Sequence, residues 1–199
     1  MSAHRQDSLR QTLKGTDLVS GTPVRLPDFK GQWVVIEAGS STCSMYTKNI
    51  PGMAELRGAH PDVRFLVVYV REAHPGERLR QHKNFDEKLA AAKLLKPKYD
   101  ENRQILVDSH DGGFHRMYGM KPNLIYVIRP DGVVHYRCDW AHVSGLKNAL
   151  EEREKSPSDR ACGYEKAACE PRHGHRHTET LWTGGIIALG LLRCDAAAR

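Results

Sequence analysis

The sequence predicts an α/β fold in which a central mixed β-sheet is flanked by helices. Short apolar runs bounded by turn residues alternate along the chain with stretches of helical periodicity, which is typical of parallel strands joined through helices. Late in the chain, the pair Asp131-Gly132 places a strong turn signal between two apolar runs. These two runs are therefore expected to form a hairpin, which adds antiparallel strands to the sheet.

Five apolar runs are expected to form the strands. The three strongest cover residues 33–38, 63–70 and 124–128, and the two weaker ones cover 104–107 and 133–137. Helices are expected over 44–58, from 84 to 95, within 109–119 and over 142–155. Asn84 and Glu87 resemble a capping box, and Pro97 is expected to stop that helix. The order β-α-β-α-β-α-β-β-α is that of a thioredoxin-like domain in its peroxiredoxin-type elaboration.

The 199 residues suffice for one core of ordinary size with a polar extension. The domain is expected over residues 20–155, after an N-terminal extension over 1–19 and before a low-order tail over 156–199 that contains cysteine and histidine. In the tail, the apolar stretch 181–192 is shorter than the roughly 20 residues that span a bilayer. Zinc accepts the side chains of Cys162, Cys169, His173, His175 and His177. Their spacing is not that of established zinc motifs, so no metal site is predicted.

Charge and cysteine content restrict the partners and the compartment. The net charge is +6, but Lys and Arg are interleaved with Asp and Glu and no nucleic-acid-binding motif is present. Neither a nucleic acid nor a membrane is therefore expected as a partner, while a homodimer is left open. Five cysteines without regular spacing, and an N-terminus without the apolar region of a signal peptide, argue against a disulfide scaffold. A reducing, cytoplasmic setting is expected.

One thiol is distinguished by its position. Cys43 follows the first strong strand through Ser40, Ser41 and Thr42, and it precedes the helix expected over 44–58. Unpaired N–H groups and the positive end of the helix dipole favour the thiolate there, and the thiolate is the reactive form. The hydroxyls of Ser40 and Thr42 are expected either to donate hydrogen bonds to the sulfur or simply to complete the turn. The competing interpretation is a buried, unreactive cysteine.

Three segments of the chain, taken together, resemble motifs of one known family. They are Gly39-Ser40-Ser41-Thr42-Cys43, the run from Tyr69 to Pro75 that contains Glu72-Ala73-His74, and the run from Pro122 to Ile128. In this order and spacing they resemble the iodothyronine deiodinases and their bacterial deiodinase-like relatives, with cysteine in the position of selenocysteine. The resemblance covers roughly residues 20–150 and implies a thiol-dependent oxidoreductase, of the kind that acts in thyroid hormone metabolism.

The resemblance implies a role for three residues. Cys43 would attack the iodine of an aryl iodide in a reductive deiodination, His74 would deliver a proton or recognise the substrate, and His82 would help to hold the iodothyronine. Imidazole titrates near neutral pH, which suits proton transfer. Each histidine also fits a purely structural role, His74 as the cap of a turn and His82 as an exposed residue before a helix.

Four further residues are candidates for the site. Glu72 and Tyr69 would orient His74 or relay a proton, although Glu72 also fits a solvated loop and Tyr69 a half-buried core position. Thr42 and Ser40 flank the thiol. Pro122 is located where thioredoxin-like folds place a cis-proline that faces the active site.

The chain departs from the family at several positions. Ser44-Met45 stands in place of two prolines, and Ser41 and Arg103 stand in place of two cysteines that would resolve the oxidised nucleophile. No bound cofactor is expected, so an external thiol such as thioredoxin or glutathione is expected to act as co-substrate.

Two other functions remain open at this point. A peroxiredoxin-like thiol peroxidase would use the same thiolate on a hydroperoxide instead of an iodinated phenol, although Ile36 replaces the proline of the peroxiredoxin motif. A non-enzymatic thioredoxin-like adaptor would leave the thiol without a role.

Overall fold

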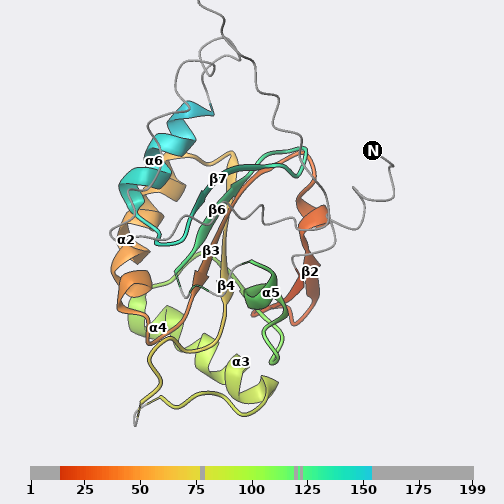
Figure 1. Cartoon of the computed structure of the whole chain (residues 1–199), viewed down its shortest axis with the longest axis vertical. Helices are drawn as coiled ribbons and strands as arrows, with labels where there is room; N and C mark the ends of the chain where they lie inside the picture. Colours follow the sequence, from red (N-terminus) through yellow and green to blue (C-terminus); the bar gives the residue numbers. More distant parts are fainter. Residues whose placement is uncertain (1–13, 77–78, 119–120, 122, 154–199) are drawn as a thin grey trace, which may run out of the picture.

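A seven-stranded mixed sheet forms the centre of the domain, with helices on both faces (Figure 1). The computed structural model describes residues 14–153, except 77–78, 119–120 and 122. The strands are β1 (Lys14–Asp17), β2 (Pro23–Arg25), β3 (Trp33–Gly39), β4 (Val63–Tyr69), β5 (Gln104–Val107), β6 (Ile125–Ile128) and β7 (Val134–Cys138). The helices are η1 (Leu26–Phe29), α2 (Ser44–Ala59), α3 (Phe85–Lys93), α4 (Leu95–Tyr99), α5 (Gly113–Met117) and α6 (Val143–Glu152).

The strands are arranged in the order β2-β1-β5-β4-β3-β6-β7. The central strands β3, β4 and β5 are parallel, whereas β6 runs antiparallel to β3 and β7 antiparallel to β6. Gly132 has a φ of 84° in the turn between β6 and β7, a conformation that glycine adopts without strain. The predicted mixed sheet and its late hairpin are confirmed.

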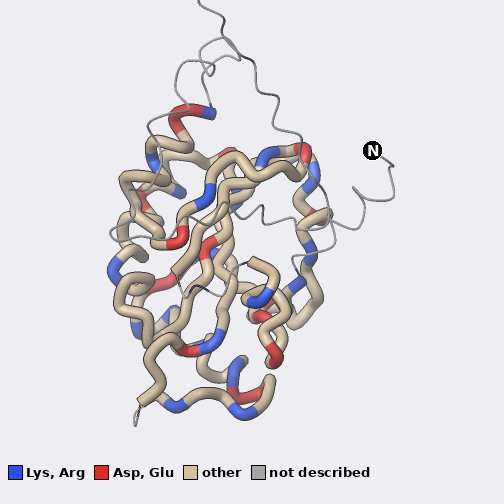
Figure 2. Tube along the Cα trace, viewed as in Figure 1, with Lys and Arg blue, Asp and Glu red and all other residues tan. Residues whose placement is uncertain are grey.

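Helices cover the two faces of the sheet unequally. Figure 1 shows α2 and α6 on one face and α5 on the other. The residues of β3 from Val34 to Gly39 are all buried, as expected for a central strand with side chains packed on both faces. Basic and acidic residues are interspersed over the described part of the chain (Figure 2), in agreement with the scattered charges of the sequence.

The sheet begins earlier in the sequence than expected. β1 pairs with both β2 and β5, and Thr16 lies opposite Val107. The boundary predicted at residue 20 is therefore too late. The run Lys14-Gly15-Thr16-Asp17 contains no apolar side chain, so hydrophobic periodicity could not reveal it.

Two helices also differ from expectation. Pro97 does not end the helical region, because α3 stops at Lys93 and α4 starts at Leu95. Pro97 then lies in the first turn of α4, where its missing N–H leaves no hydrogen bond unmade. The helix expected within 109–119 is only the five-residue α5.

The tail beyond residue 153, with its cysteines and histidines, lies outside the described residues.

Candidate active site

Cys43 lies at the junction of β3 and α2, where the sequence predicted it. It is the N-cap residue of α2, with φ −86° and ψ 105°, and its carbonyl accepts a hydrogen bond from the Thr47 N–H at 3.0 Å. Its thiol is free. The side chain is only 2% exposed and packs in an apolar cluster that includes Tyr46 and Tyr69. The sulfur is therefore almost fully covered, and an electrophile reaches it only when neighbouring side chains move.

The loop after β4 is hydrogen-bonded to the loop that carries Cys43. β3 and β4 are parallel neighbours, with Gly39 opposite Tyr69, so their carboxyl ends meet at one edge of the sheet. Thr42 donates two hydrogen bonds to Oε2 of Glu72, from its N–H at 2.9 Å and from its hydroxyl at 2.6 Å. The Ala73 N–H donates to Oγ of Ser40 at 3.2 Å. These bonds hold the two loops together beside the thiol.

Tyr69 and Glu72 form a buried row of polar groups with Ser41. The Tyr69 hydroxyl donates to Oε1 of Glu72, and Oγ of Ser41 lies 3.2 Å from the Tyr69 hydroxyl. Because the Tyr69 proton points to Glu72, the Ser41 hydroxyl is the donor in the second bond. Burial raises the pKa of Tyr69, and the Glu72 carboxylate raises it further, so this phenol stays protonated. The row can pass a proton without forming a phenolate.

His74 is exposed at the rim of the same site. Its backbone N–H donates to Oγ1 of Thr42 at 3.0 Å, and its ring nitrogen Nδ1 lies 3.3 Å from the Thr42 carbonyl oxygen. A carbonyl only accepts hydrogen bonds, so Nδ1 carries the hydrogen in this contact. Nε2 is then the ring nitrogen that remains for proton exchange.

His82 is buried on the inner side of the site. Its ring centroid lies 5.8 Å from that of Tyr69, and its Nε2 is buried and has no hydrogen-bond partner among the described residues. Burial lowers the pKa of His82, an effect that the Glu72 carboxylate opposes. The alternative of an exposed residue before the helix is therefore wrong. A neutral ring with an unpaired nitrogen can bind a hydroxyl or an N–H of a ligand.

Some expected contacts are replaced by others. The Thr42 hydroxyl donates to Glu72 and not to the Cys43 sulfur, because a carboxylate is the stronger acceptor. Oγ of Ser40 accepts from Ala73, so its observed role is to join the two loops. Glu72 is 5% exposed, which excludes the solvated-loop interpretation. Pro122 lies outside the described residues.

Comparison with known proteins now identifies the family. The family described as iodothyronine deiodinase matches residues 18–152. The chain belongs to the iodothyronine deiodinase family. It is 26% identical over 131 residues to the type II iodothyronine deiodinase of Fundulus heteroclitus, covering 57% of this chain and 49% of that protein. It is 24% identical over 132 residues to the thyroxine 5-deiodinase of Sparus aurata, covering 60% and 49%. The chain spans about half the length of these curated relatives.

Solved structures show the fold of this deiodinase-family chain. A secreted disulfide oxidoreductase of Mycobacterium tuberculosis superposes with a TM-score of 0.55 at 18% identity, covering 76% of this chain and 99% of that one. A thioredoxin-like protein from Aeropyrum pernix gives a TM-score of 0.58 at 13% identity, covering 75% and 95%. The predicted thioredoxin-like fold is confirmed. Over the described residues there is no helix long and apolar enough to cross a membrane, and no group of residues suited to a metal ion.

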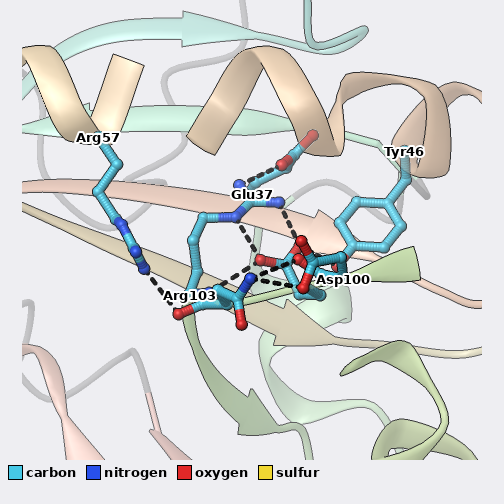
Figure 3. A network of polar contacts seen from close by, with 7 residues as sticks. Glu37, Tyr46, Arg57, Asp100 and Arg103 are labelled. Carbon is cyan, nitrogen blue, oxygen red and sulfur yellow. Dashed lines mark hydrogen bonds and ion pairs between the residues drawn. The ribbon is translucent and has the colours of Figure 1, made fainter. Parts of the chain in front are cut away.

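A buried ionic network that includes Tyr46 of α2 was missed by sequence reasoning (Figure 3). The Arg103 guanidinium donates to Glu37 at 2.6 Å and to both carboxylate oxygens of Glu101, at 2.8 and 2.6 Å. All three side chains are at most 2% exposed. The Tyr46 hydroxyl donates to Glu101 at 2.8 Å. Glu37 in the middle of an apolar strand was the available signal, because a charge buried there requires a partner.

The network fixes the first turn of α2, which follows Cys43. The Tyr46 ring lies against Gly39, where an added Cβ would come within 2.5 Å of ring carbon. Glycine is therefore required at position 39 for this packing. The family motif residue thus has a local steric reason in this chain.

Proposed function

We propose that the protein is a thiol-dependent oxidoreductase that removes iodine from an aryl iodide, with Cys43 as the nucleophile. The observation that carries this proposal is the gathering of proton-transfer groups around the cap of α2, where Thr42 links Cys43 to Glu72, Tyr69 and His74. Membership of the iodothyronine deiodinase family supports the same reaction class. The relatives that share it are named as type II and thyroxine 5-deiodinases.

The reaction balances with an external thiol as reductant. The Cys43 thiolate forms an S–I bond while the C–I bond breaks, and the electron pair of that bond stays on the aryl carbon, which takes up a proton. An external thiol then attacks the Cys43 sulfur and displaces iodide. A second thiol releases Cys43 and leaves as the disulfide. The aryl iodide is reduced, two thiols are oxidised, and no bound cofactor is needed. A cytoplasmic pool of thioredoxin or glutathione would supply the thiols.

The surrounding residues have distinct roles in this proposal. His74 exchanges protons with solvent at the rim and is the donor to the aryl carbon. Thr42 orients His74 through its hydroxyl and carbonyl oxygens, and Glu72, which accepts from Tyr69, holds Thr42 in place. His82 binds the phenol hydroxyl of the substrate through its unpaired Nε2.

One observation favours a second candidate, a thiol peroxidase. The side chain of Cys43 is 2% exposed, and a small hydroperoxide reaches such a covered sulfur more easily than an iodinated phenol does. The thiolate would attack the O–O bond, which gives a sulfenic acid that external thiol reduces.

One experiment separates the two reactions. Reduced protein is incubated with an iodinated phenol and, separately, with hydrogen peroxide, and iodide release and intact mass are measured in each case. The proposed function requires catalytic iodide release that depends on added dithiol. Sulfenic acid formation with peroxide, without iodide release from the phenol, would assign the peroxidase instead. If the protein reacts with neither compound, the non-enzymatic adaptor is the remaining interpretation.

Replacing Glu72 by glutamine is expected to lower turnover by about ten- to a hundredfold. The amide presents one acceptor oxygen where the carboxylate accepts from both Thr42 and Tyr69. The rate of iodide release measures the effect, and thermal unfolding checks that the variant is folded. Glu55→Gln, on the exposed surface of α2, is the matched control and should retain full turnover. Equal rates for the two variants would mean that Glu72 does not hold the site in its active arrangement.

A further inference from the structure

A hollow opens at the end of the sheet opposite the thiol site. Its volume of about 710 Å³ is within the range of small-molecule sites. Its walls come from the first residues of β4 and β5, the end of α2, α4 and the loop after β1. β4 runs from Val63 in this wall to Tyr69 at the thiol site, a distance of roughly 20 Å along the strand. The hollow is therefore separate from the thiol site, and the proposed reaction gives it no role.

The cations and the carboxylates of the wall differ in their exposure. Arg57, Arg64 and Lys96 line the hollow and are exposed. The two carboxylates of the wall belong to Asp17 and Glu101, which are buried at 8% and 2% exposure. The surface that the hollow presents to solvent is therefore positively charged. Charge of one sign in a concave site raises the local concentration of ions of the opposite sign.

Both carboxylates are already bonded to neighbouring groups of the fold. Glu101 is paired with the buried Arg103 at 2.6 Å. Asp17 accepts from the side-chain amide of Gln104 at 2.6 Å and from backbone N–H groups of the turn after β1. Among the contacts of the described residues, neither carboxylate forms an ion pair with an exposed cation of the hollow.

Two guanidinium groups are held in place by neutral acceptors. Arg57 donates from Nη1 to the Asn102 carbonyl oxygen at 2.6 Å (Figure 3). Arg64 donates from Nε and Nη2 to Oε1 of Gln104. Asn102 and Gln104 are two residues apart, so their Cα atoms are separated by at most about 7 Å. The start of β5 thus holds both arginines at one hollow, and each keeps its charge and further N–H donors.

We propose that this hollow binds a small molecule that carries phosphate groups. A guanidinium group pairs with phosphate oxygens through two parallel N–H donors, and an arginine that is already positioned loses little side-chain freedom on binding. A diphosphate offers oxygens to Arg57, Arg64 and Lys96 together, whereas a single carboxylate satisfies only one of them. The exposed apolar side chains of Val19 and Pro61 line the same hollow and can contact the organic part of such a ligand.

Titration of the full-length protein with pyrophosphate and, separately, with ADP tests this proposal. Calorimetry should show saturable binding of one molecule per chain with a Kd below about 1 mM at low salt, and added salt should weaken it. Backbone amide NMR should show shifts at residues 61–64 and 102–104, and none at 40–43. Equal affinity for the two probes would mean that the phosphate groups alone are recognised. Tighter binding of ADP would mean that its organic part also contacts the wall, and either result supports the proposal.

Substitutions of single arginines locate the contacts. Arg57→Met and Arg64→Met should each weaken pyrophosphate binding at least about tenfold, because each removes one charge-assisted pair. Arg64→Lys keeps the charge without the planar donors and should retain part of the affinity. Arg116→Met is the matched control, because Arg116 is exposed on α5, outside the hollow, and is ion-paired with Asp111. This variant loses the same charge and should bind pyrophosphate as the wild type does.

Several results would overturn the proposal. Equal weakening in Arg64→Met and Arg116→Met would show only a general attraction of anions to a basic protein. Absence of saturable binding of both probes, or amide shifts confined to the loop of Cys43, would also contradict it. A poly-glutamate peptide that binds at the hollow when neither phosphate probe does would assign this surface to an acidic protein segment. Because no aryl iodide is used, these results are independent of the proposed function.

Discussion

The Cys43→Ser variant is expected to release no iodide from an iodinated phenol and to keep its fold. A serine hydroxyl is not ionised at neutral pH and lacks the polarizable sulfur that attacks iodine. Serine is also a favoured N-cap residue, so α2 should still begin after position 43. Because the site is buried, the hydroxyl is expected to cost about 1–3 kcal/mol of unfolding free energy.

Iodide release and urea unfolding measure the two parts of this prediction. Ser44→Ala is the matched control, because Ser44 is exposed at the next position of the chain. It should release iodide at the wild-type rate. Turnover by Cys43→Ser would mean that another group is the nucleophile, and this result would contradict the proposed function.

Arg103→Met is expected to lower the free energy of unfolding by about 3–5 kcal/mol. The change removes the cation that Glu37 and Glu101 share, and it leaves two carboxylates without a countercharge in the interior. Burial already raises the pKa of Glu37, and Arg103 opposes that rise. In the variant, the folded state therefore binds a proton at Glu37 more tightly than the unfolded state does. The loss of stability should accordingly grow as the pH rises above the ordinary range of a glutamate.

Urea unfolding at two pH values checks the size and the sign of this effect. Arg57→Met is the control, because Arg57 is exposed and donates only to the Asn102 carbonyl oxygen among the described contacts. It should cost no more than about 0.5 kcal/mol. Adding Glu37→Gln and Glu101→Gln to Arg103→Met should recover part of the lost stability. Equal losses in the two arginine variants would show that the buried network contributes nothing specific.

The local pattern of apolar residues was sufficient to predict most strands of the central sheet. Apolar runs predicted β3, β4, β5 and the hairpin of β6 and β7 to within one or two residues at their ends. The first two strands, β1 and β2, were not predicted. β1 (Lys14–Asp17) is stabilised by backbone pairing to β5 and not by apolar side chains of its own. Hydrophobic periodicity reports burial of side chains and does not register such pairing.

The position of Cys43 at the start of a helix could also be predicted from the local sequence. A strand followed by small residues and then a helix places the thiol at a helix N-terminus in any such fold. The motif order in turn pointed to the deiodinase family, which the match over residues 18–152 confirms.

The partners of the polar groups were decided only by the tertiary structure. Thr42 and Glu72 are 30 residues apart, and Glu37 and Arg103 are 66 apart, yet each pair is hydrogen-bonded. The first contact exists because the parallel neighbours β3 and β4 end at one edge of the sheet, where the loops after them meet. The second joins a residue within β3 to a residue just before β5, and β4 lies between these two strands in the sheet. The sequence by itself determined the fold, the family and the place of the thiol. Only the folded chain decided that the thiol is covered, where each hydroxyl proton points and which charges are buried together, because these depend on three-dimensional neighbours and not on spacing along the chain.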